Sequence, residues 1–359
     1  MTGPFDGMLV DHVLFYVTDV ARTADWFTGS FDFQVYGATG PGGPGLARSV
    51  GLGADRIRLV LAQPPAGDNP GAGYLARHGD GVADIALSVP DAEAAFAEAV
   101  RRGAGQVAAP ARQGDGVVTA TITAFGDVTH TFVQRAAGAD PRTLPGLRPV
   151  AGEAGRSAPR CRLGEVDHFA VCVETGRLET TVEYYRRVLD FDLIFTEHIE
   201  VGAQAMVTKV VQSRSGAVTL TLIEPQESPV VSHIDEFLRD HGGAGVQHMA
   251  FTADDIIAAV DAAGGRGVEF LSAPAAYYGM LPRRVALTRH PIGELQRLNI
   301  LVDKDHDGQL YQIFAKSVHP RNTFFLELIE RQGARSFGSG NITALYQAVE
   351  LQRSKEEAA

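Results

Sequence analysis

The chain has 359 residues, of which 45% are hydrophobic and 21% are charged, and its formal net charge is −11 at pH 7. This composition is typical of a globular protein large enough for two domains, and the sequence contains no run of about 18 apolar residues of the kind that spans a membrane. The negative charge argues against nucleic acid and anionic membranes as partners.

The N-terminus, MTGPFDGMLVDH, lacks the basic and apolar regions of a signal peptide. The two cysteines, Cys161 and Cys172, show no CxxC spacing. We therefore expect a reduced, cytoplasmic protein without a disulfide framework or a thiolate zinc site.

A long internal repeat runs through the chain. VDHVLFYV at residues 10–17 returns as VDHFAVCV at 166–173, and each copy continues into an amphipathic helix and a second strand. A second pair of matching segments, 78–110 and 241–274, again predicts a strand, a helix and a glycine-rich helix stop. The pattern predicts two homologous halves, each built from two such units.

The repeat sets the expected domain boundaries. We predict an N-terminal domain over 1–137, a linker over 138–162 that is rich in Ala, Gly and Pro, and a C-terminal domain over 163–359. After a strand at 323–330, a glycine-rich loop leads to a helix with Asn341 as its expected N-cap. The first half has no counterpart to this helix, so we expect it to act as a lid over the second half.

The two halves differ at matching polar positions of their strands. The first half carries His12, Asp84 and Thr131 where the second carries His168, His248 and Glu327. Two imidazoles and a carboxylate form a facial triad, which suits non-heme Fe(II) because three coordination positions stay open. Zinc more often keeps a single open position for water. Glu327 lies in the apolar run TFFLELI, where an unpaired carboxylate would be costly, so it needs a cation.

Structural alternatives exist for each of these residues. A single strand histidine is more often a core or surface residue than a ligand, and Glu330 competes with Glu327 for the carboxylate position. The combination of three ligand types at equivalent points of a duplicated scaffold favours the metal site. We expect structural or surface positions for the remaining histidines, which are His78, His130, His198, His233, His241, His290, His306 and His319.

Four motifs carry a resemblance to a known family. GAGVQHMAF, YQIFAK, FFLELIERQGA and FGSGNITALYQAVE resemble the 4-hydroxyphenylpyruvate dioxygenase family of the vicinal-oxygen-chelate superfamily, and the resemblance extends over most of residues 8–353. It implies an α+β fold of two homologous domains, each made of paired βαβββ modules in an open barrel, with a C-terminal lid helix. It also implies that His168, His248 and Glu327 hold Fe(II), since they match the VDH, VQH and FFxE motifs of that family.

The resemblance further implies the substrate and its contacts. The expected ligand is a small aromatic α-keto acid with O₂ as cosubstrate and no external 2-oxoglutarate, because the substrate carries its own keto acid. Phe314 and Phe337 match phenylalanines that sandwich the substrate ring, whereas ordinary packing is the alternative for each contact. The full set of expected contacts is Thr208, Thr221, Ile223, Gln312, Phe314, Phe337 and Ile342.

Two activities share this scaffold and substrate, namely ring hydroxylation to homogentisate and benzylic hydroxylation to 4-hydroxymandelate. Ring-hydroxylating members typically read PINEP and GKGNF where this chain reads TLIEP and GSGNI, which places Thr221 for proline, Ile223 for asparagine and Ile342 for phenylalanine. Thr208 stands where both kinds of member more often carry serine. These differences favour the benzylic reaction, with homogentisate formation as the alternative.

Two further alternatives come from the same superfamily. An extradiol ring-cleaving dioxygenase would share the ligand set but would need an additional histidine and tyrosine near the metal, for which the sequence offers no convincing positions. A non-catalytic small-molecule-binding protein would need neither three ligands nor a lid. A homo-oligomer is compatible with the sequence, which does not fix the oligomeric state.

Overall fold

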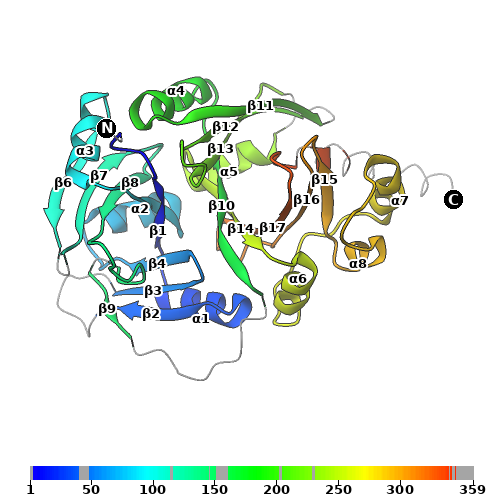
Figure 1. Cartoon of the computed structure of the whole chain (residues 1–359), viewed down its shortest axis with the longest axis horizontal. Coiled ribbons are helices and arrows are strands. Elements are labelled where there is room, and N and C mark those ends of the chain that lie inside the picture. The colour runs from blue at the N-terminus through cyan, green and yellow to red at the C-terminus, as the bar shows by residue number, and fades with distance from the viewer. Residues whose placement is uncertain are drawn as a thin grey trace.

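The computed structural model describes residues 3–39, 48–113, 116–144, 146–150, 161–201, 204–228, 231–338, 340–341 and 344. These residues form two mixed β-sheets that lie next to each other, the N-terminal one in blue to green and the C-terminal one in green to red (Figure 1). Helices pack on the sheets, which gives the expected α+β architecture. Among the described residues, no helix is long and apolar enough to cross a membrane.

The N-terminal half contains two βαβββ modules. The first comprises β1 (Leu9–Tyr16), α1 (Val20–Phe31), β2 (Gln34–Ala38), β3 (Arg48–Ala54) and β4 (Ile57–Gln63). After α2 (Pro70–His78), the second comprises β5 (Gly81–Ser88), α3 (Ala92–Arg101), β6 (Gln106–Arg112), β7 (Val118–Thr123) and β8 (Thr129–Gln134).

The C-terminal half repeats this order with an insertion. Its first module comprises β10 (Leu163–Cys172), α4 (Leu178–Leu189), β11 (Asp192–Val201), β12 (Gln204–Gln212) and β13 (Thr219–Pro225), followed by α5 (His233–His241). Its second comprises β14 (Gly245–Ala253), α6 (Ile256–Gly264), α7 (Ala275–Arg284), α8 (Ile292–Arg297), β15 (Leu301–Lys304), β16 (Gln309–Phe314) and β17 (Phe325–Gln332). The insertion consists of α7 and α8, which lie beyond β15 at the right of Figure 1.

The strand order confirms the duplication that the sequence predicts. The sheets run β6-β7-β8-β5-β1-β4-β3-β2-β9 and β11-β12-β13-β10-β14-β17-β16-β15. In each half the first strand pairs in parallel with the fourth strand of its own module and antiparallel with the first strand of the next module, as β1 does with β4 and β5 and β10 does with β13 and β14. Residues at matching repeat positions therefore occupy matching places in the two sheets.

Short polar residues start several of the helices. Asp19, Asp91 and Asp255 each accept a hydrogen bond from the backbone N–H three residues later, at the first turns of α1, α3 and α6. Ser232 and Asp235 form a reciprocal capping box at the start of α5. Such caps satisfy backbone donors that have no partner inside the helix, so the sequence fixes where each helix begins.

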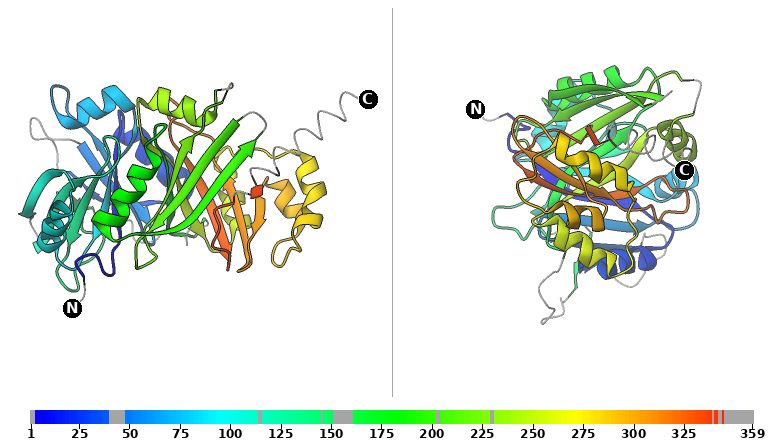
Figure 2. Two further views of the ribbon diagram at one scale, coloured as in Figure 1. Left: turned by 90° about the horizontal axis from the view of Figure 1, so that it is seen from above. Right: turned by 90° about the vertical axis from the view of Figure 1, so that its right-hand side faces the viewer.

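One hydrophobic core continues from one half into the other. The ring of Phe15 lies 5.1 Å from that of Phe324 in an edge-to-face contact, and His130 is hydrogen-bonded through Nε2 to the Tyr185 hydroxyl at 2.8 Å. Helices α2 and α5 contact each other (Figure 2). The rings of His78 in α2 and His241 in α5 stack at 4.4 Å. These histidines are buried structural residues, as expected from the sequence.

Two features between and after the halves differ from the sequence prediction. The predicted linker contains β9 (Arg148–Pro149), which pairs with β2 to form the edge of the N-terminal sheet and is too short to show a period in sequence. Residues 340–341 and 344 are helical, as predicted for the lid. The remaining residues of the predicted lid helix lie outside the described residues. Asn341 is not the N-cap, because it lies within the helical residues and its Oδ1 accepts a hydrogen bond from Tyr277.

Candidate metal centre

Three neighbouring strands of the C-terminal sheet bring His168, His248 and Glu327 together. In the register of β10, β14 and β17, Ala250 pairs with both His168 and Glu327, and His248 pairs with Ala170. Paired residues share one face of a sheet, so the three polar side chains project from the same concave face. Glu327 Oε2 lies 3.3 Å from His168 Nε2 and 3.4 Å from His248 Nε2.

These three side chains are almost completely enclosed. Glu327 is only 2% exposed, and both histidine rings are at least largely buried. Burial raises the pKa of Glu327, but the hydrogen bonds and positive charge of the two histidines outweigh it and lower that pKa. Burial likewise lowers the pKa of His168, but its contacts with Asp167 and Glu327 prevail and raise the pKa to about 9. The site is thus built around a buried carboxylate that requires positive charge.

The geometry of the site fits a metal ion. The three donor atoms lie within 4.8 Å of one another. Metal–ligand bonds of about 2.1 Å at right angles place neighbouring donor atoms about 3 Å apart, close to the separations seen here. The Nε2 atom of His248 faces the Glu327 carboxylate, while its Nδ1 is buried and finds no hydrogen-bond partner among the described residues. The surrounding small side chains, Ala170 and Ala250, leave room beside the ligands.

A second group of ionisable residues, Asp255, His290 and Glu330, has similar spacing but a different role. Glu330 Oε2 accepts hydrogen bonds from His290 Nε2 at 2.9 Å and from the backbone N–H of Ile256 at 2.8 Å. Its other oxygen pairs with Arg289 at 2.9 Å, while Asp255 caps α6. Because Glu330 is already fully hydrogen-bonded, the competition between Glu327 and Glu330 is resolved in favour of Glu327 as the candidate ligand.

The expected substrate contacts lie on the same face of the sheet as the candidate ligands. Thr221 and Ile223 pair with Ala170 and Cys172 of β10, and Thr208 pairs with Ile223. Gln312 and Phe314 pair with Ile329 and Glu327 of β17. Five of the seven residues expected to contact the substrate therefore line the same concave surface.

Two polar atoms of the expected substrate contacts find no hydrogen-bond partner among the described residues. They are Thr221 Oγ1 and Gln312 Oε1, and both are buried. A buried polar atom without a partner costs free energy, so such atoms usually have a partner that binds from outside the chain. Their placement fits a role in binding a polar ligand beside the metal centre.

Aromatic rings close the site. The Phe337 ring lies 5.3 Å from the His168 ring, and the Phe314 ring lies 5.7 Å from the His248 ring. Next to Phe337, Gly338 has a φ of +75°, and a Cβ there would lie 2.0 Å from Gln312 Oε1. The backbone of this loop therefore lies directly on the Gln312 side chain. Ile342 falls outside the described residues.

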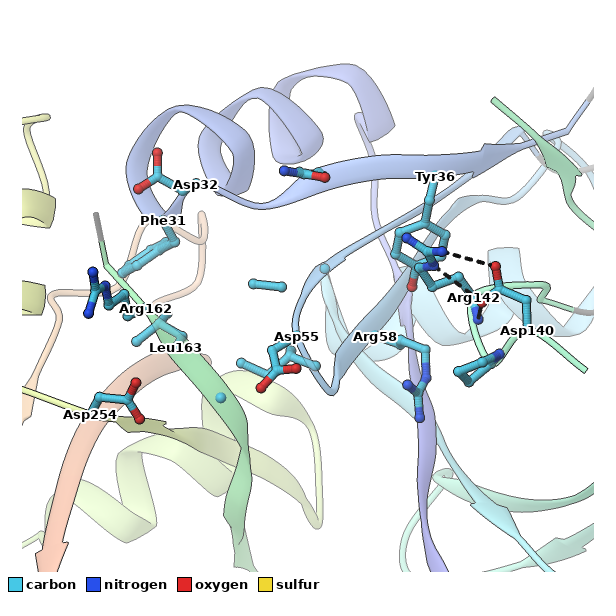
Figure 3. A pocket seen from close by; sticks show the side chains of 16 residues that line it. Phe31, Asp32, Tyr36, Asp55, Arg58, Asp140, Arg142, Arg162, Leu163 and Asp254 are labelled. Carbon is cyan, nitrogen blue, oxygen red and sulfur yellow. Dashed lines mark hydrogen bonds and ion pairs between the residues drawn. The ribbon is translucent and has the colours of Figure 1, made fainter. Parts of the chain in front are cut away.

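One cavity borders this arrangement, and a second one shares no lining residue with it. One of about 690 Å³ is lined by Asp167, Phe195, Arg331 and Phe337, so Phe337 separates it from His168. The other, of about 610 Å³, lies between α1, β2 and the start of β10 and is shown in Figure 3. Its arginines and aspartates carry charges of both signs, and neither group of candidate metal ligands found among the described residues lies in it.

A further feature, which the sequence analysis missed, is an Arg–Asp–His chain behind the site. Arg331 donates two hydrogen bonds to Asp167, which in turn is hydrogen-bonded to His168 Nδ1 at 2.8 Å. These contacts, opposed by burial, hold the pKa of Asp167 well below its usual range. The sequence signal was the aspartate in both VDH motifs together with the arginine that ends both FFLELIER and VTHTFVQR.

The N-terminal sheet has an equivalent series of hydrogen-bonded Arg, Asp and His side chains but not the candidate ligand set. Arg135 donates two hydrogen bonds of 2.8 Å to Asp11, and Asp11 is hydrogen-bonded to His12 Nδ1 at 2.7 Å. Asp84 occupies the place of His248, and its carboxylate accepts a hydrogen bond from Thr131, which occupies the place of Glu327. Among the described residues, both groups of candidate metal ligands lie in the C-terminal half.

Comparison with known proteins agrees with this organisation. The sequence profile described as the glyoxalase/bleomycin resistance protein/dioxygenase superfamily matches residues 9–129 and 165–313. The 4-hydroxyphenylpyruvate dioxygenase of Caenorhabditis briggsae is 34% identical over 98% of this chain and 94% of its own length. That of Dictyostelium discoideum is 35% identical over 96% of this chain and 97% of its own.

A solved structure matches the whole fold as well. A mutant of 4-hydroxymandelate synthase from Streptomyces coelicolor is 38% identical, covers 98% of this chain and 100% of its own, and has a TM-score of 0.84. The expected fold and the expected class of enzyme, a dioxygenase, are therefore confirmed. The chain belongs to the glyoxalase/bleomycin resistance protein/dioxygenase superfamily and, within it, to the family of the 4-hydroxyphenylpyruvate dioxygenases.

Proposed function

We propose that this enzyme converts 4-hydroxyphenylpyruvate and O₂ to 4-hydroxymandelate and CO₂, by oxidative decarboxylation and hydroxylation of the benzylic carbon. The substrate class is supported by the names of the relatives, and the benzylic reaction by the similarity to 4-hydroxymandelate synthase. No external 2-oxoglutarate is needed, because the substrate itself supplies the keto acid.

In this proposal His168, His248 and Glu327 hold Fe(II). When bound there, such an ion would supply electrons for the activation of O₂ and open coordination positions for the keto acid and O₂. Asp167 holds the Nδ1 proton of His168, which leaves Nε2 to act as the ligand atom. Glu327 balances part of the charge of the ion inside a buried site.

The remaining side chains orient the substrate and exclude water. Thr221 and Gln312, whose buried oxygens find no partner among the described residues, can form hydrogen bonds with its polar groups. Phe314 and Phe337 pack beside the histidines, where they can hold an aromatic ring. The Phe337–Gly338 segment covers the site, so that a reactive intermediate is kept from solvent.

The observation that favours the benzylic product is the apolar environment of Ile223. This side chain packs in a cluster with Cys172 and Met206 and with Ile234 and Phe237 of α5. The wall formed by β13 thus offers the Thr221 hydroxyl but no side-chain amide at position 223. Without an amide to anchor the ring there, the ring can tilt so that the benzylic carbon faces the metal, and a displacement on the order of 1 Å can change a rate by about a hundredfold.

The direct test is to identify the product of aerobic incubation with Fe(II) and 4-hydroxyphenylpyruvate. The two candidate products are isomers, so proton NMR is needed to distinguish a benzylic CH–OH from a substituted ring with an intact CH₂. Hydroxymandelate is the expected product. Homogentisate, which the names of the curated relatives favour, would overturn the benzylic reaction, and no product with iron bound would favour the ring-cleaving or binding alternatives.

The role of position 223 is tested separately by Ile223→Asn, with Ile223→Val as the matched control. The asparagine variant should divert a measurable share of turnover to homogentisate, because it introduces an amide on the sheet face that carries the candidate ligands. The valine variant keeps the apolar surface and should keep the product of the unaltered enzyme. Identical product ratios in both variants would show that Ile223 does not set the site of hydroxylation.

A further inference from the structure

Arg331 makes contacts in two directions from the end of β17. Toward β10, its Nε and Nη2 donate hydrogen bonds of 2.7 and 2.8 Å to the two oxygens of Asp167. Toward the loop after β17, its Nη1 donates to the carbonyl oxygens of Ser336 at 2.7 Å and Ala334 at 3.1 Å. Its Cζ also lies 5.1 Å from the centroid of the Phe337 ring.

Asp167 and Phe337, both of which Arg331 contacts, each contact the candidate ligand His168. Asp167 is hydrogen-bonded to His168 Nδ1, which fixes the orientation of a candidate ligand. Phe337 packs edge-on against the ring of the same histidine, with an interplanar angle of 88°, and forms the wall of the 690 Å³ outer cavity. A single guanidinium therefore connects a candidate ligand to the loop that covers it.

We propose that Arg331 is a positioning residue that orients His168 for metal binding and, through the same side chain, holds the 334–338 loop closed over the metal centre. The inference rests on the proposed function only in that His168, His248 and Glu327 bind a metal. It predicts that opening of the loop and weakening of the metal site occur together when Arg331 is altered.

The geometry requires arginine at this position. A planar guanidinium can engage both carboxylate oxygens of Asp167 along one edge while its third nitrogen reaches two backbone carbonyls. A lysine ammonium provides three donors from a single point and cannot satisfy both groups at these distances. Lysine should therefore keep the charge but lose either the carboxylate pairing or the loop contacts.

The N-terminal half provides a matched control within the same chain. Arg135 donates to both oxygens of Asp11 at 2.8 Å and also to the carbonyl oxygen of Thr143, and Asp11 is hydrogen-bonded to His12. The contacts are the same in kind, but Asp84 and Thr131 replace the other two candidate ligands. Loss of Arg135 should thus destabilise the fold in a similar way without affecting the metal centre.

The test compares Arg331→Met and Arg331→Lys with Arg135→Met and Arg135→Lys in the full-length, metal-free protein. Co(II) affinity is measured from its visible absorption, and loop closure from hydrogen exchange of peptides covering 334–338. Arg331→Met should weaken Co(II) binding by about 10- to 100-fold and accelerate exchange in the loop, because carboxylates behind metal ligands typically contribute that much to affinity. The Co(II) affinity and the loop exchange rate of Arg331→Lys should lie between those of Arg331→Met and of the unaltered protein. Both Arg135 variants should bind Co(II) as tightly as the unaltered protein does.

Three results would overturn the inference. Unchanged Co(II) affinity in Arg331→Met would exclude a role in orienting the ligand, and equal losses in the Arg331 and Arg135 variants would show a general effect on stability. Weaker binding with unchanged loop exchange would show that the two ends of Arg331 act independently. Failure of the unaltered protein to bind Co(II) would instead refute the metal site, and hence the proposed function. If Arg331→Met fails to fold, Arg331→Lys carries the same comparison.

Discussion

Asp84 occupies the place in the N-terminal sheet that His248 occupies in the C-terminal sheet. The difference shows how one side chain changes the chemistry of equivalent positions in the two halves. Asp84 is 5% exposed, and its Oδ2 accepts hydrogen bonds from the hydroxyls of Thr129 and Thr131. Burial is the main cause that raises the pKa of this carboxyl to about 6, and the threonine hydrogen bonds oppose it only in part. The position thus holds a carboxyl that resists ionisation.

This elevated pKa predicts a pH-dependent loss of stability. Below about pH 4 the Asp84 carboxyl is protonated in both the folded and the unfolded chain and has no effect. As the pH rises from about 4 to 6, the unfolded chain loses this proton first, so the free energy of unfolding falls. Above pH 6 the loss levels off at about 3 kcal/mol, from a pKa difference of about 2.

Asp84→Asn should therefore be more stable than the unaltered protein at pH 8 and gain little at pH 4. Urea denaturation of the metal-free protein at both pH values measures this difference. Substitution of the exposed Asp68 by Asn serves as the control for removing one carboxylate outside the buried sheet. An equal gain at pH 4 and pH 8 for Asp84→Asn would contradict the assignment of the effect to ionisation.

The sequence was sufficient to predict the three candidate ligands but not the side chains behind them. His168, His248 and Glu327 stand out because a duplicated chain allows each to be compared with a non-ligand at the same strand position. The link between Asp167 and Arg331 joins residues 164 positions apart, and only the folded register brings them within hydrogen-bonding distance. The missing partners of Thr221 and Gln312 likewise become visible only once burial is known.

At the scale of elements, the βαβββ modules were predictable because strand alternation and helix periodicity repeat twice in each half. Helices α7 and α8 interrupt the last module and have no counterpart in the first half, so the repeat gave no indication of them. Helix α7 nevertheless contacts the start of the expected lid. The hydroxyl of Tyr277 in α7 donates to Asn341 Oδ1 at 2.7 Å and accepts from the backbone N–H of Val302 at 2.8 Å.

Helix α7 therefore anchors the start of the expected lid, and Tyr277→Phe should loosen it. The substitution leaves the buried Val302 N–H and Asn341 Oδ1 unpaired, at a cost of about 1 to 3 kcal/mol. Hydrogen exchange should accelerate in peptides that contain residues 338–341. Tyr278→Phe is the control, because the Tyr278 hydroxyl donates one long hydrogen bond of 3.3 Å to the Ile300 carbonyl and, within the part of the chain that the structure describes, none to the expected lid. Similar exchange in the two variants would argue against anchoring by Tyr277.

At the scale of the whole molecule, the shared core makes the two halves dependent on each other. The aromatic contact between Phe15 and Phe324 and the buried hydrogen bond between His130 and Tyr185 both connect the halves. Burial lowers the pKa of His130 to about 4, so this ring stays neutral near neutral pH. Its Nε2 therefore accepts a hydrogen bond from the Tyr185 hydroxyl. The sequence predicted two domains but could not show how closely they pack.

We therefore expect both halves to unfold in one transition. Trp26, the sole tryptophan, lies in α1 and reports on the N-terminal half by its fluorescence, whereas bound Co(II) reports on the C-terminal half. The two signals should be lost at the same urea concentration. Tyr185→Phe leaves His130 Nε2 without a partner and should shift both signals together by about 1 to 3 kcal/mol. Two separate transitions would show that the halves unfold independently.

The N-terminal sheet indicates how the proposed metal ion would be acquired. It keeps the arginine, aspartate and histidine frame and the same strand order, although among the described residues neither group of candidate metal ligands lies in that half. A sheet of this design thus forms without an ion at its centre, unlike a zinc finger, which needs its ion to fold. Under the proposed function, we therefore expect the newly made chain to fold first and to bind Fe(II) afterwards. Treatment with a chelator should then produce an inactive but intact protein that regains activity when Fe(II) is returned.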